Sequence, residues 1–269
     1  MNIGTKCFPD RKHPYIMGIL NVTPDSFSDG GQWNQLDKAL FRAEEMVREG
    51  ADLIDVGGES TRPGFVPLSA QEEMDRVLPV LEALKERVDV PLSLDTSKAA
   101  VAQAGIQAGA DLINDIWGLK GDPDMAEVIA RNGVPCCLMH NRTNARYGLF
   151  LVDLLRDLEE SLAIAEQAGI ARETIILDPG VGFAKSQEQN LEVIDRMEEL
   201  HVFGCPLLLG ASRKSVIGKA LDLPVEQRLE GTLVTSVFAA LKGCRFVRVH
   251  DISANVRALR MVHALRCGY

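Results

Sequence analysis

The chain alternates short apolar runs with longer stretches in which apolar and charged residues are mixed. The mixed stretches place apolar residues three or four positions apart, as at Leu40, Ala43 and Val47, which is the spacing of an amphipathic helix. The apolar runs have the length of buried strands. We therefore expect strands at residues 15–20, 53–56, 90–94, 111–113, 134–139, 174–177, 206–209 and 246–249, and helices at 37–49, 70–87, 99–108, 125–132, 151–168, 187–200, 226–241 and 253–265.

Strands that alternate with helices indicate an α/β fold with a parallel sheet. Eight such units in about 250 residues favour a closed (β/α)8 barrel, the TIM barrel, over an open sheet. No linker or low-complexity segment divides the chain, so we expect residues 1–269 to form one domain. Ser69 followed by Glu72 predicts a capping box at one helix start. Thr96 or Ser97 is expected to cap the helix at 99–108.

Composition excludes some classes of partner. The 269 residues are 46% hydrophobic and 25% charged, which is ordinary for a soluble protein, and the net charge of −9 disfavours nonspecific nucleic-acid binding. No apolar run approaches the roughly 20 residues of a membrane span. The polar start of the chain through His13 argues against a secretion signal. Six cysteines without a Cys-x-x-Cys pair are expected to be reduced thiols, which favours a cytoplasmic location.

Polar side chains gather directly after the predicted strands, whereas the segments that lead into the strands carry no comparable set. In a TIM barrel the carboxyl ends of the strands meet at one mouth, where the active site lies. The residues expected at this mouth are Asn21, Glu59, Ser60, Thr61, Arg62, Asp95, Asn114, His140, Asp178, Lys214 and His250.

One subset of these residues suits a flat heterocycle that presents several N–H groups. Asp95, Asn114 and Asp178 carry short acceptors. Lys214 can offset their charge and donate to a ring oxygen or nitrogen. Any one of the three acceptors is as well explained as a satisfied polar group of the barrel rim. Together they favour a binding role, because clustered carboxylates repel one another unless something pairs with them.

A second subset suits an anion. Thr61, Arg62, Arg248 and His250 can bind phosphate oxygens, Arg62 in a bidentate manner. Two purely structural roles stay open for these residues. Arg248 can form an ion pair with Asp251 at the barrel rim, and His250 can be a hydrogen-bonded core histidine.

Two further residues extend this subset. Asn21 offers a neutral oxygen that can take one site on Mg²⁺, while the metal keeps its waters and the substrate phosphates. Ser215 is expected at a helix N-terminus, where a carboxylate or phosphate can bind.

Other reaction classes find no support in the sequence. There is no Gly-x-x-x-x-Gly-Lys-Ser/Thr phosphate loop, no Gly-x-Ser-x-Gly nucleophile turn and no zinc spacing. Gly57-Gly58 lacks the third glycine of a dinucleotide motif. The pattern therefore indicates group transfer from a diphosphate rather than redox or acyl-transfer chemistry.

At these residues the sequence resembles the dihydropteroate synthases, the folate-pathway enzymes that sulfonamides inhibit. The resemblance runs from Met17 to about Arg260. It rests on Met-Gly-Ile-Leu-Asn-Val-Thr-Pro-Asp-Ser-Phe-Ser-Asp-Gly-Gly at 17–31, Asp-Val-Gly-Gly-Glu-Ser-Thr-Arg-Pro-Gly at 55–64, Leu-Asp-Thr-Ser-Lys at 94–98, Asn-Asp at 114–115, Met-His at 139–140, Leu-Asp-Pro-Gly-Val-Gly-Phe at 177–183, Ser-Arg-Lys at 212–214 and Arg-Val-His-Asp at 248–251.

The resemblance implies a TIM barrel, usually dimeric, that condenses 4-aminobenzoate with 6-hydroxymethyl-7,8-dihydropterin diphosphate and releases pyrophosphate with Mg²⁺ as cofactor. Carried over motif by motif, Arg62, Lys214 and Asp29 serve catalysis, with Asp29 ordering the first loop. The implied pterin site is Asp95, Asn114, Asp178 and Lys214. The implied diphosphate site is Asn21, Thr61, Arg62, Arg248 and His250, with Asn21 acting through the metal. The implied aminobenzoate site is Arg62, Pro63, Phe183, Lys214 and Ser215.

The sequence departs from the family pattern at two loops. Residues 141–147 read Asn-Arg-Thr-Asn-Ala-Arg-Tyr where a Met/Gln/Gly-rich loop is common, and Ser-Val-Ile at 215–217 replaces a basic or aromatic pair. Neither change removes a residue assigned to a substrate.

Two rival functions share part of this pattern. A pterin-binding methyltransferase, which passes a methyl group from a folate to a corrinoid, would keep the carboxylates and Asn114 but would not need the diphosphate residues. A noncatalytic pterin-binding barrel would lose loop residues such as Asn21 or Arg62, and both are present.

Overall fold

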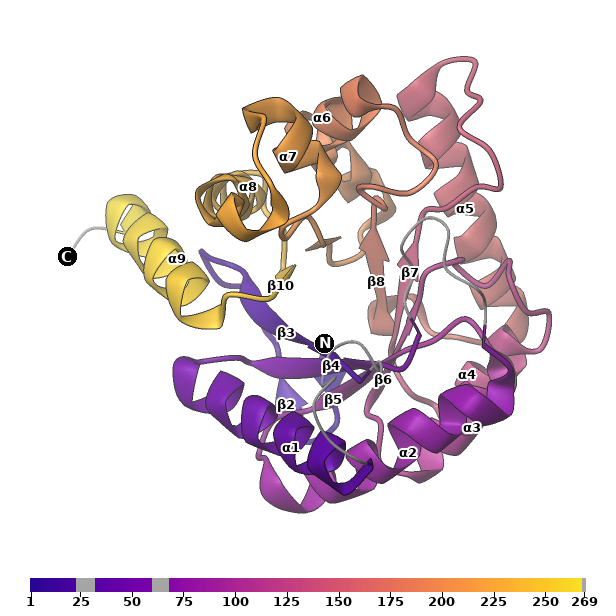
Figure 1. Cartoon of the computed structure of the whole chain (residues 1–269). Helices are drawn as coiled ribbons and strands as arrows, with labels where there is room; N and C mark the ends of the chain where they lie inside the picture. The colour runs from indigo at the N-terminus through magenta and orange to yellow at the C-terminus, as the bar shows by residue number, and fades with distance from the viewer. Residues whose placement is uncertain (23–31, 60–67, 268–269) are drawn as a thin grey trace.

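A closed ring of parallel strands forms the centre of the computed structural model, which describes residues 1–22, 32–59 and 68–267 (Figure 1). The strands of the ring are β3 (Tyr15–Asn21), β4 (Leu53–Gly57), β5 (Leu92–Asp95), β6 (Leu112–Asp115), β7 (Cys136–Met139), β8 (Ile175–Asp178), β9 (Leu208–Leu209) and β10 (Phe246–Val249).

The ring closes between β8 and β9. Hydrogen-bonded neighbours follow the order β8-β7-β6-β5-β4-β3-β10-β9, and Leu177 forms a parallel bridge with Leu207 across the remaining gap. The Leu177 amide also donates to the Pro206 carbonyl at 2.9 Å. The predicted TIM barrel is therefore confirmed.

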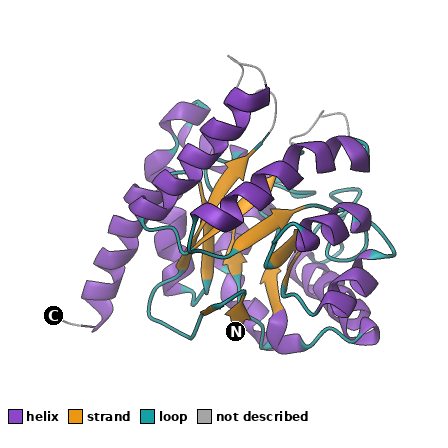
Figure 2. Cartoon of the chain, turned by 90° about the horizontal axis from the view of Figure 1, so that it is seen from below, coloured by secondary structure: helices purple, strands orange, loops and turns teal. Residues whose placement is uncertain are grey.

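Helices surround the strands on the outside (Figure 2). They are α1 (Gln32–Glu49), α2 (Ala70–Arg87), α3 (Ala99–Gln107), α4 (Met125–Asn132), α5 (Phe150–Ala168), α6 (Gln187–Asp195), α7 (Ser215–Leu221), α8 (Leu229–Leu241) and α9 (Ile252–Cys267), with 3-10 helices η2 (Arg172–Thr174), η3 (Met197–Phe203) and η4 (Val225–Gln227). Their apolar faces and the outward side chains of the strands form the larger buried core. Among the described helices, none has the length and apolarity that crossing a bilayer requires.

The predicted helix caps had different outcomes. The capping box at α2 is confirmed, because Ser69 Oγ accepts from the Glu72 amide at 3.2 Å and Glu72 Oε2 accepts from the Ser69 amide at 2.9 Å. The prediction for α3 is wrong. Lys98 occupies the N-cap position, and the Ala99 amide donates instead to Asp122 Oδ2 at 2.8 Å.

Two predicted helices are shorter than expected. The helix predicted at 187–200 ends at Asp195, because Arg196 leaves helical geometry (φ −113°, ψ 21°) and η3 follows. The helix predicted at 226–241 begins at Leu229, because η4 and Arg228 precede it, and the Arg228 side chain donates to the Leu223 and Arg213 carbonyls. Apolar spacing alone does not separate a 3-10 turn from the adjoining α-helix.

An N-terminal hairpin, which the sequence pattern did not predict, closes one end of the barrel. It consists of β1 (Asn2–Ile3) and β2 (Lys6–Cys7). The chain start lies near the middle of the ring in Figure 1 and at one end of the strands in Figure 2. Ile3 and Phe8 are buried in an inner cluster with the first inward side chains of the strands, namely Tyr15, Met17, Leu53, Leu112, Cys137, Ile176, Leu208 and Phe246.

The inward positions change from apolar to polar on the way to the other end of the barrel. Successive side chains of a strand point to opposite faces, so residues two apart share the interior. On β4, apolar Leu53 is followed inward by Asp55. On β10, Phe246 is followed by Arg248. The carboxyl ends of the strands therefore enclose a polar layer above an apolar floor.

Candidate active site

Asp55 is the central acceptor of the polar layer. It is fully buried and accepts hydrogen bonds from Ser93 Oγ at 2.5 Å, Asn114 Nδ2 at 3.2 Å and Arg248 Nε at 2.5 Å. Sequence reasoning did not assign Asp55 to the site. The signal was present, because Asp55 is a carboxylate inside an otherwise apolar strand and a buried charge needs a partner.

Arg248 joins Asp55 to Asp95. Its Nη2 lies 2.7 Å from Asp95 Oδ2, and its side chain is 18% exposed. The alternative of a rim ion pair between Arg248 and Asp251 is wrong, because Asp251 pairs with Arg213 at 2.5 Å. Burial raises the pKa of Asp95 to about 7, although the Arg248 guanidinium acts in the opposite direction.

Asp178 and Lys214 face each other across a glycine. Asp178 Oδ1 accepts from the Gly180 amide at 2.7 Å, and Lys214 Nζ donates to the Val181 carbonyl at 2.6 Å. A Cβ on Gly210 would lie 3.4 Å from Asp178 Oδ2 and 3.8 Å from Lys214 Nζ. Burial raises the pKa of Asp178, and it lowers the pKa of Lys214 to about 8 against the attraction of Asp178.

Asn21 and His250 lie at neighbouring strand ends. Asn21 is the last residue of β3, and a Cβ on Gly57 would lie 3.8 Å from both Asn21 Oδ1 and Asp95 Oδ2. His250 follows β10, and its Nδ1 lies 3.0 Å from Ser212 Oγ. Within the described ranges, no group of three or more His, Cys, Asp or Glu side chains has the arrangement of a metal site.

Phe183 also lies beside Lys214. Its ring centroid is 4.9 Å from Lys214 Nζ. Ser215 is the first residue of α7, directly after Lys214, which confirms the prediction that Ser215 lies at a helix N-terminus. Five predicted residues, Asp29, Ser60, Thr61, Arg62 and Pro63, lie outside the described residues.

The described side chains provide two kinds of recognition in one layer. The acceptors of Asp95, Asn114 and Asp178 suit the N–H groups of a flat polar ring. Arg248 and Lys214 carry positive charge into the same layer and suit an anion or a developing negative charge. Residues from six different strands or strand ends are thus brought together, as the sequence pattern predicted.

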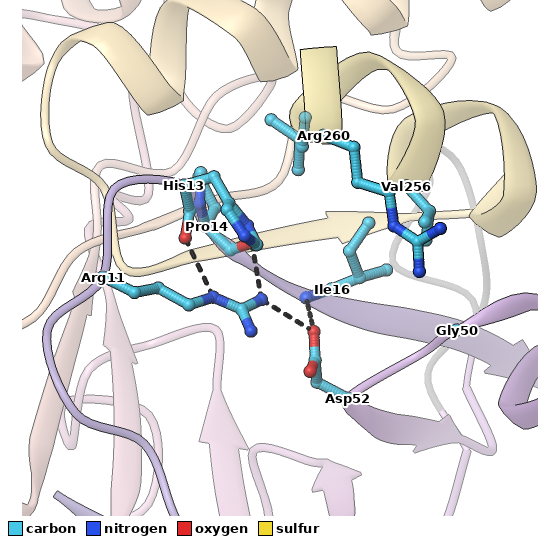
Figure 3. A pocket seen from close by; sticks show the side chains of 9 residues that line it. Arg11, His13, Pro14, Ile16, Gly50, Asp52, Val256 and Arg260 are labelled. Carbon is cyan, nitrogen blue, oxygen red and sulfur yellow. Dashed lines mark hydrogen bonds and ion pairs between the residues drawn. The ribbon is translucent and has the colours of Figure 1, made fainter. Parts of the chain in front are cut away.

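A separate small cavity lies at the opposite ends of the strands. It has a volume of about 120 Å³ and is lined by residues such as Arg11, Asp52 and Arg260 (Figure 3). The Arg11 guanidinium donates to Asp52 and to the His13 and Pro14 carbonyls, which ties the entry of β3 to that of β4. None of the predicted site residues lines this cavity.

Comparison with known proteins identifies the family. Residues 17–250 match the family model described as pterin binding enzyme. The chain is 56% identical over 262 residues to the dihydropteroate synthase of Clostridium beijerinckii, covering 97% of each. A solved dihydropteroate synthase from Clostridium difficile, in the presence of pteroic acid, superposes with a TM-score of 0.94 at 48% identity and covers 97% of this chain and 99% of that one.

A second solved structure is also similar. The dihydropteroate synthase of Xanthomonas albilineans with 4-aminobenzoic acid gives a TM-score of 0.92 at 40% identity, covering 96% of this chain and 94% of that one. The family match, the sequence identities and the fold agree with one another. The chain therefore belongs to the dihydropteroate synthases, within the family of pterin-binding enzymes.

Proposed function

We infer that this chain condenses 4-aminobenzoate with (7,8-dihydropterin-6-yl)methyl diphosphate to give 7,8-dihydropteroate and pyrophosphate. The observation that carries this function is the layer in which three acceptor side chains, Asp95, Asn114 and Asp178, share the barrel interior with Arg248 and Lys214. One substrate is a flat ring rich in N–H groups and carries a diphosphate, so it needs both kinds of partner in one place.

The pterin half belongs at the base of the layer. Asp95 and Asp178 accept from ring N–H groups, and Asn114, whose Nδ2 donates to Asp55, accepts through its side-chain oxygen. Lys214 reaches the same space from the segment after β9, where its ammonium lies close to Asp178 across Gly210. It can donate to a ring oxygen or nitrogen while offsetting the carboxylates.

The diphosphate half belongs beside β10 and β3. Arg248 and His250 approach from the end of β10, and Asn21 approaches from the end of β3, its hydrogen-bonded neighbour. Their assignment to the diphosphate, together with that of Thr61 and Arg62, is part of this proposal. Arg248 already bonds Asp55 and Asp95, so phosphate oxygens would bind to the edge of a guanidinium whose position is fixed.

Mg²⁺ is the proposed cofactor, with Asn21 as the protein ligand. A single neutral oxygen suits this ion, which usually keeps several waters and takes other ligands from substrate phosphates. When bound, it would supply positive charge to the leaving diphosphate.

The chemistry requires little of the protein beyond orientation and charge. The C–O bond between the pterin methylene and the diphosphate breaks, and its electron pair leaves with pyrophosphate. The amine nitrogen of 4-aminobenzoate forms the new C–N bond and then loses a proton. Arg248 and His250 stabilise charge on the leaving group, and the nearby carboxylates stabilise positive charge on the methylene. Phe183, Lys214 and Ser215, with Arg62 and Pro63, hold the amine in line.

Pyrophosphate release tests this function directly. The purified chain receives pterin diphosphate, 4-aminobenzoate and Mg²⁺, and each is omitted in turn. Release that requires all three, with dihydropteroate identified by mass, is the expected result. Tight binding of a pterin without its diphosphate, and no release, would point to a methyltransferase or a binding-only barrel instead.

A homodimer is the proposed assembly. Val234, Phe238 and Leu241 of α8 are exposed at helical spacing, and Met261 and Leu265 of the adjacent α9 are exposed as well. An apolar surface over two neighbouring helices is typical of a protein interface. Light scattering should give twice the monomer mass, and Phe238→Glu should shift it to the monomer with the circular dichroism of the barrel unchanged.

A cytoplasmic location also remains a proposal. All six cysteines are free thiols, and Cys136, Cys137, Cys205 and Cys244 are buried without forming disulfides. Free thiols suit a reducing compartment.

A further inference from the structure

Lys185 ties together the segment that follows β8, residues 179–185. Its Nζ lies 2.9 Å from the Gly180 carbonyl, 3.1 Å from the Phe183 carbonyl and 2.9 Å from His140 Nδ1. An ammonium group has three donors and no acceptor, so these three contacts use all of them. The side chain therefore closes the segment onto the end of β7.

The orientation of His140 is fixed by the residues around it. Because the Asp157 carboxylate can only accept, Nε2 carries the proton that it donates to Asp157 Oδ2 at 2.9 Å, which leaves Nδ1 of the neutral ring to accept from Lys185. Arg142 holds the same carboxylate with two hydrogen bonds, at 2.5 and 3.0 Å. Burial lowers the pKa of His140 to about 3, so the ring stays neutral and its Nδ1 remains an acceptor.

The unusual loop at residues 141–147 makes a second connection to the same segment. Tyr147 donates from its hydroxyl to the Ala184 carbonyl at 2.9 Å, and the Arg142 guanidinium lies 4.3 Å from the centre of the Tyr147 ring. Arg142 thus supports both contacts to the segment, through Asp157 and His140 on one side and through Tyr147 on the other.

This segment supplies the surroundings of Lys214. The Val181 carbonyl accepts from Lys214 Nζ, and the Phe183 ring lies beside the same ammonium group. Gly180 (φ +71°) passes so close to the His140 carbonyl that a Cβ there would collide with it. A shift of the segment would therefore move both the acceptor of Lys214 and the Phe183 ring.

We propose that Lys185 is a positioning residue of the condensation: through the Gly180 and Phe183 carbonyls and His140, it fixes Phe183 and the Val181 carbonyl so that Lys214 is held between the pterin and the aminobenzoate. Arg142 and Tyr147 of the loop after β7, together with Asp157 of α5, support it. This inference rests on the proposed function, since it gives Lys185 a part in the same reaction without contact to either substrate.

The test replaces Lys185 with methionine and compares steady-state kinetics with those of the parent protein. Loss of charge-assisted hydrogen bonds to the segment should raise KM for 4-aminobenzoate and lower kcat, each by about tenfold. KM for the pterin diphosphate should rise less than KM for 4-aminobenzoate. Asp178 and Lys214 contact the segment through Gly180 and Val181, but Asp95 and Asn114 are held by Arg248 and Asp55 instead. Lys120→Met is the matched control. Lys120 is also partly buried and donates to the Asp157 carbonyl at 2.8 Å, but it makes no hydrogen bond to residues 179–185.

Hydrogen exchange separates this inference from the proposed function. The amides of residues 180–184 should exchange faster in Lys185→Met than in the parent and in Lys120→Met, whether or not the protein is active. Tyr147→Phe, which removes one hydrogen bond to the segment, should produce smaller changes in the same direction and replaces Lys185→Met if that variant does not fold.

Two results would overturn the inference. One is unchanged exchange in residues 180–184 of both variants. The other is faster exchange combined with normal kinetics for 4-aminobenzoate in an active enzyme. An inactive parent protein would refute the proposed function, and with it the catalytic part of the role of Lys185, while exchange still decides whether Lys185 holds the segment.

Discussion

Arg248 Nε lies 2.5 Å from Asp55 Oδ2 inside the strand ring, so the cation assigned to the diphosphate is held by a fully buried carboxylate. Replacing Asp55 leaves the buried guanidinium with Asp95 as its remaining carboxylate partner. We expect Asp55→Asn to lower the free energy of unfolding by about 3 to 5 kcal/mol, measured by urea denaturation. Asp10→Asn is the control and should have little effect, because Asp10 pairs with Arg245 but its side chain is 90% exposed. Equal losses in the two variants would contradict this account.

The pH dependence of kcat/KM should follow Asp95 and Lys214. The pKa of Asp95 is raised to about 7, so below that pH the carboxyl is protonated and loses acceptor capacity. The pKa of Lys214 is lowered to about 8, so above that pH the amine loses its charge. The profile should therefore fall on both sides of a narrow maximum. Asp95→Asn should remove the acid limb in its residual activity. Lys214→Met should leave only the alkaline fall that comes from Lys185, because burial lowers the pKa of Lys185 to about 7. If the acid and alkaline falls of kcat/KM are unchanged in both variants, other groups are responsible for the pH dependence.

Gly210 should matter through the space that it leaves open. An alanine methyl group there would lie 3.4 Å from Asp178 Oδ2 and 3.8 Å from Lys214 Nζ, and would occupy the gap beside both groups. We expect Gly210→Ala to weaken pterin binding by about tenfold, measured by calorimetry, because the ring must use the same gap. The melting temperature should change little. Normal pterin affinity in this variant would place the ring elsewhere.

Lys98 compensates two carboxylates on the side of β4 and α2. Its Nζ lies 2.5 Å from Glu59 Oε2 and 2.5 Å from Glu73 Oε2, and Glu59 Oε1 accepts from the Leu68 amide at 2.9 Å. Glu73 is only 1% exposed, and its Oε1 has no hydrogen-bond partner among the described residues. Lys98→Met should therefore lower the free energy of unfolding by about 3 to 5 kcal/mol at pH 8.

The Lys98→Met variant also tests why stability is lost. A buried carboxylate that has lost its cation binds a proton more readily in the folded state than in the unfolded state. As the pH falls toward 5 this carboxylate becomes neutral, so the difference in unfolding free energy between Lys98→Met and the parent should become smaller. Glu73→Gln combined with Lys98→Met should restore part of the stability, because the buried charge is gone. A loss that is the same at both pH values, and no recovery in the double variant, would show that Lys98 acts by packing alone.

Asn21 should set the metal requirement if it is the protein ligand of Mg²⁺. Asn21→Ala should raise the Mg²⁺ concentration that gives half-maximal pyrophosphate release, because the ion loses its protein ligand. Asn21→Asp should lower that concentration, because a carboxylate binds the ion more strongly. The KM for 4-aminobenzoate serves as the internal control and should stay near the parent value. An unchanged Mg²⁺ requirement in both variants would remove Asn21 from the metal site.

The barrel could be predicted from the sequence because each strand repeats the same pattern of residues. Short apolar runs ending in Asn21, Asp95 or Asp178 place polar groups at the carboxyl ends, and those ends meet in any closed parallel ring. The strand at 246–249 and the helices at 70–87 and 125–132 have the predicted bounds. These are segments whose apolar periodicity begins and ends sharply.

The missed features depend on contacts that no local pattern contains. Asp55 was overlooked because its three donors, Ser93, Asn114 and Arg248, come from three other strands. The N-cap of α3 was assigned to the wrong residue because its partner Asp122 lies beyond the next strand. The hairpin of β1 and β2 is too short to give a periodic signal and is held by tertiary packing of Ile3 and Phe8.

That hairpin has a consequence for the sequence of events at the active site. Ile3 and Phe8 seal the floor of the barrel, with the Phe8 ring centroid 4.8 Å from that of Tyr15 and 5.6 Å from that of Phe246. Molecules can therefore enter and leave only past the strand ends that carry Asp95 and Asp178. A ring that occupies the deep polar layer must arrive before a partner that covers it, and it can depart only after that partner or joined to it. The blocked floor thus leaves the interior open at one end, and with the substrates placed as proposed we expect the pterin diphosphate to bind before 4-aminobenzoate.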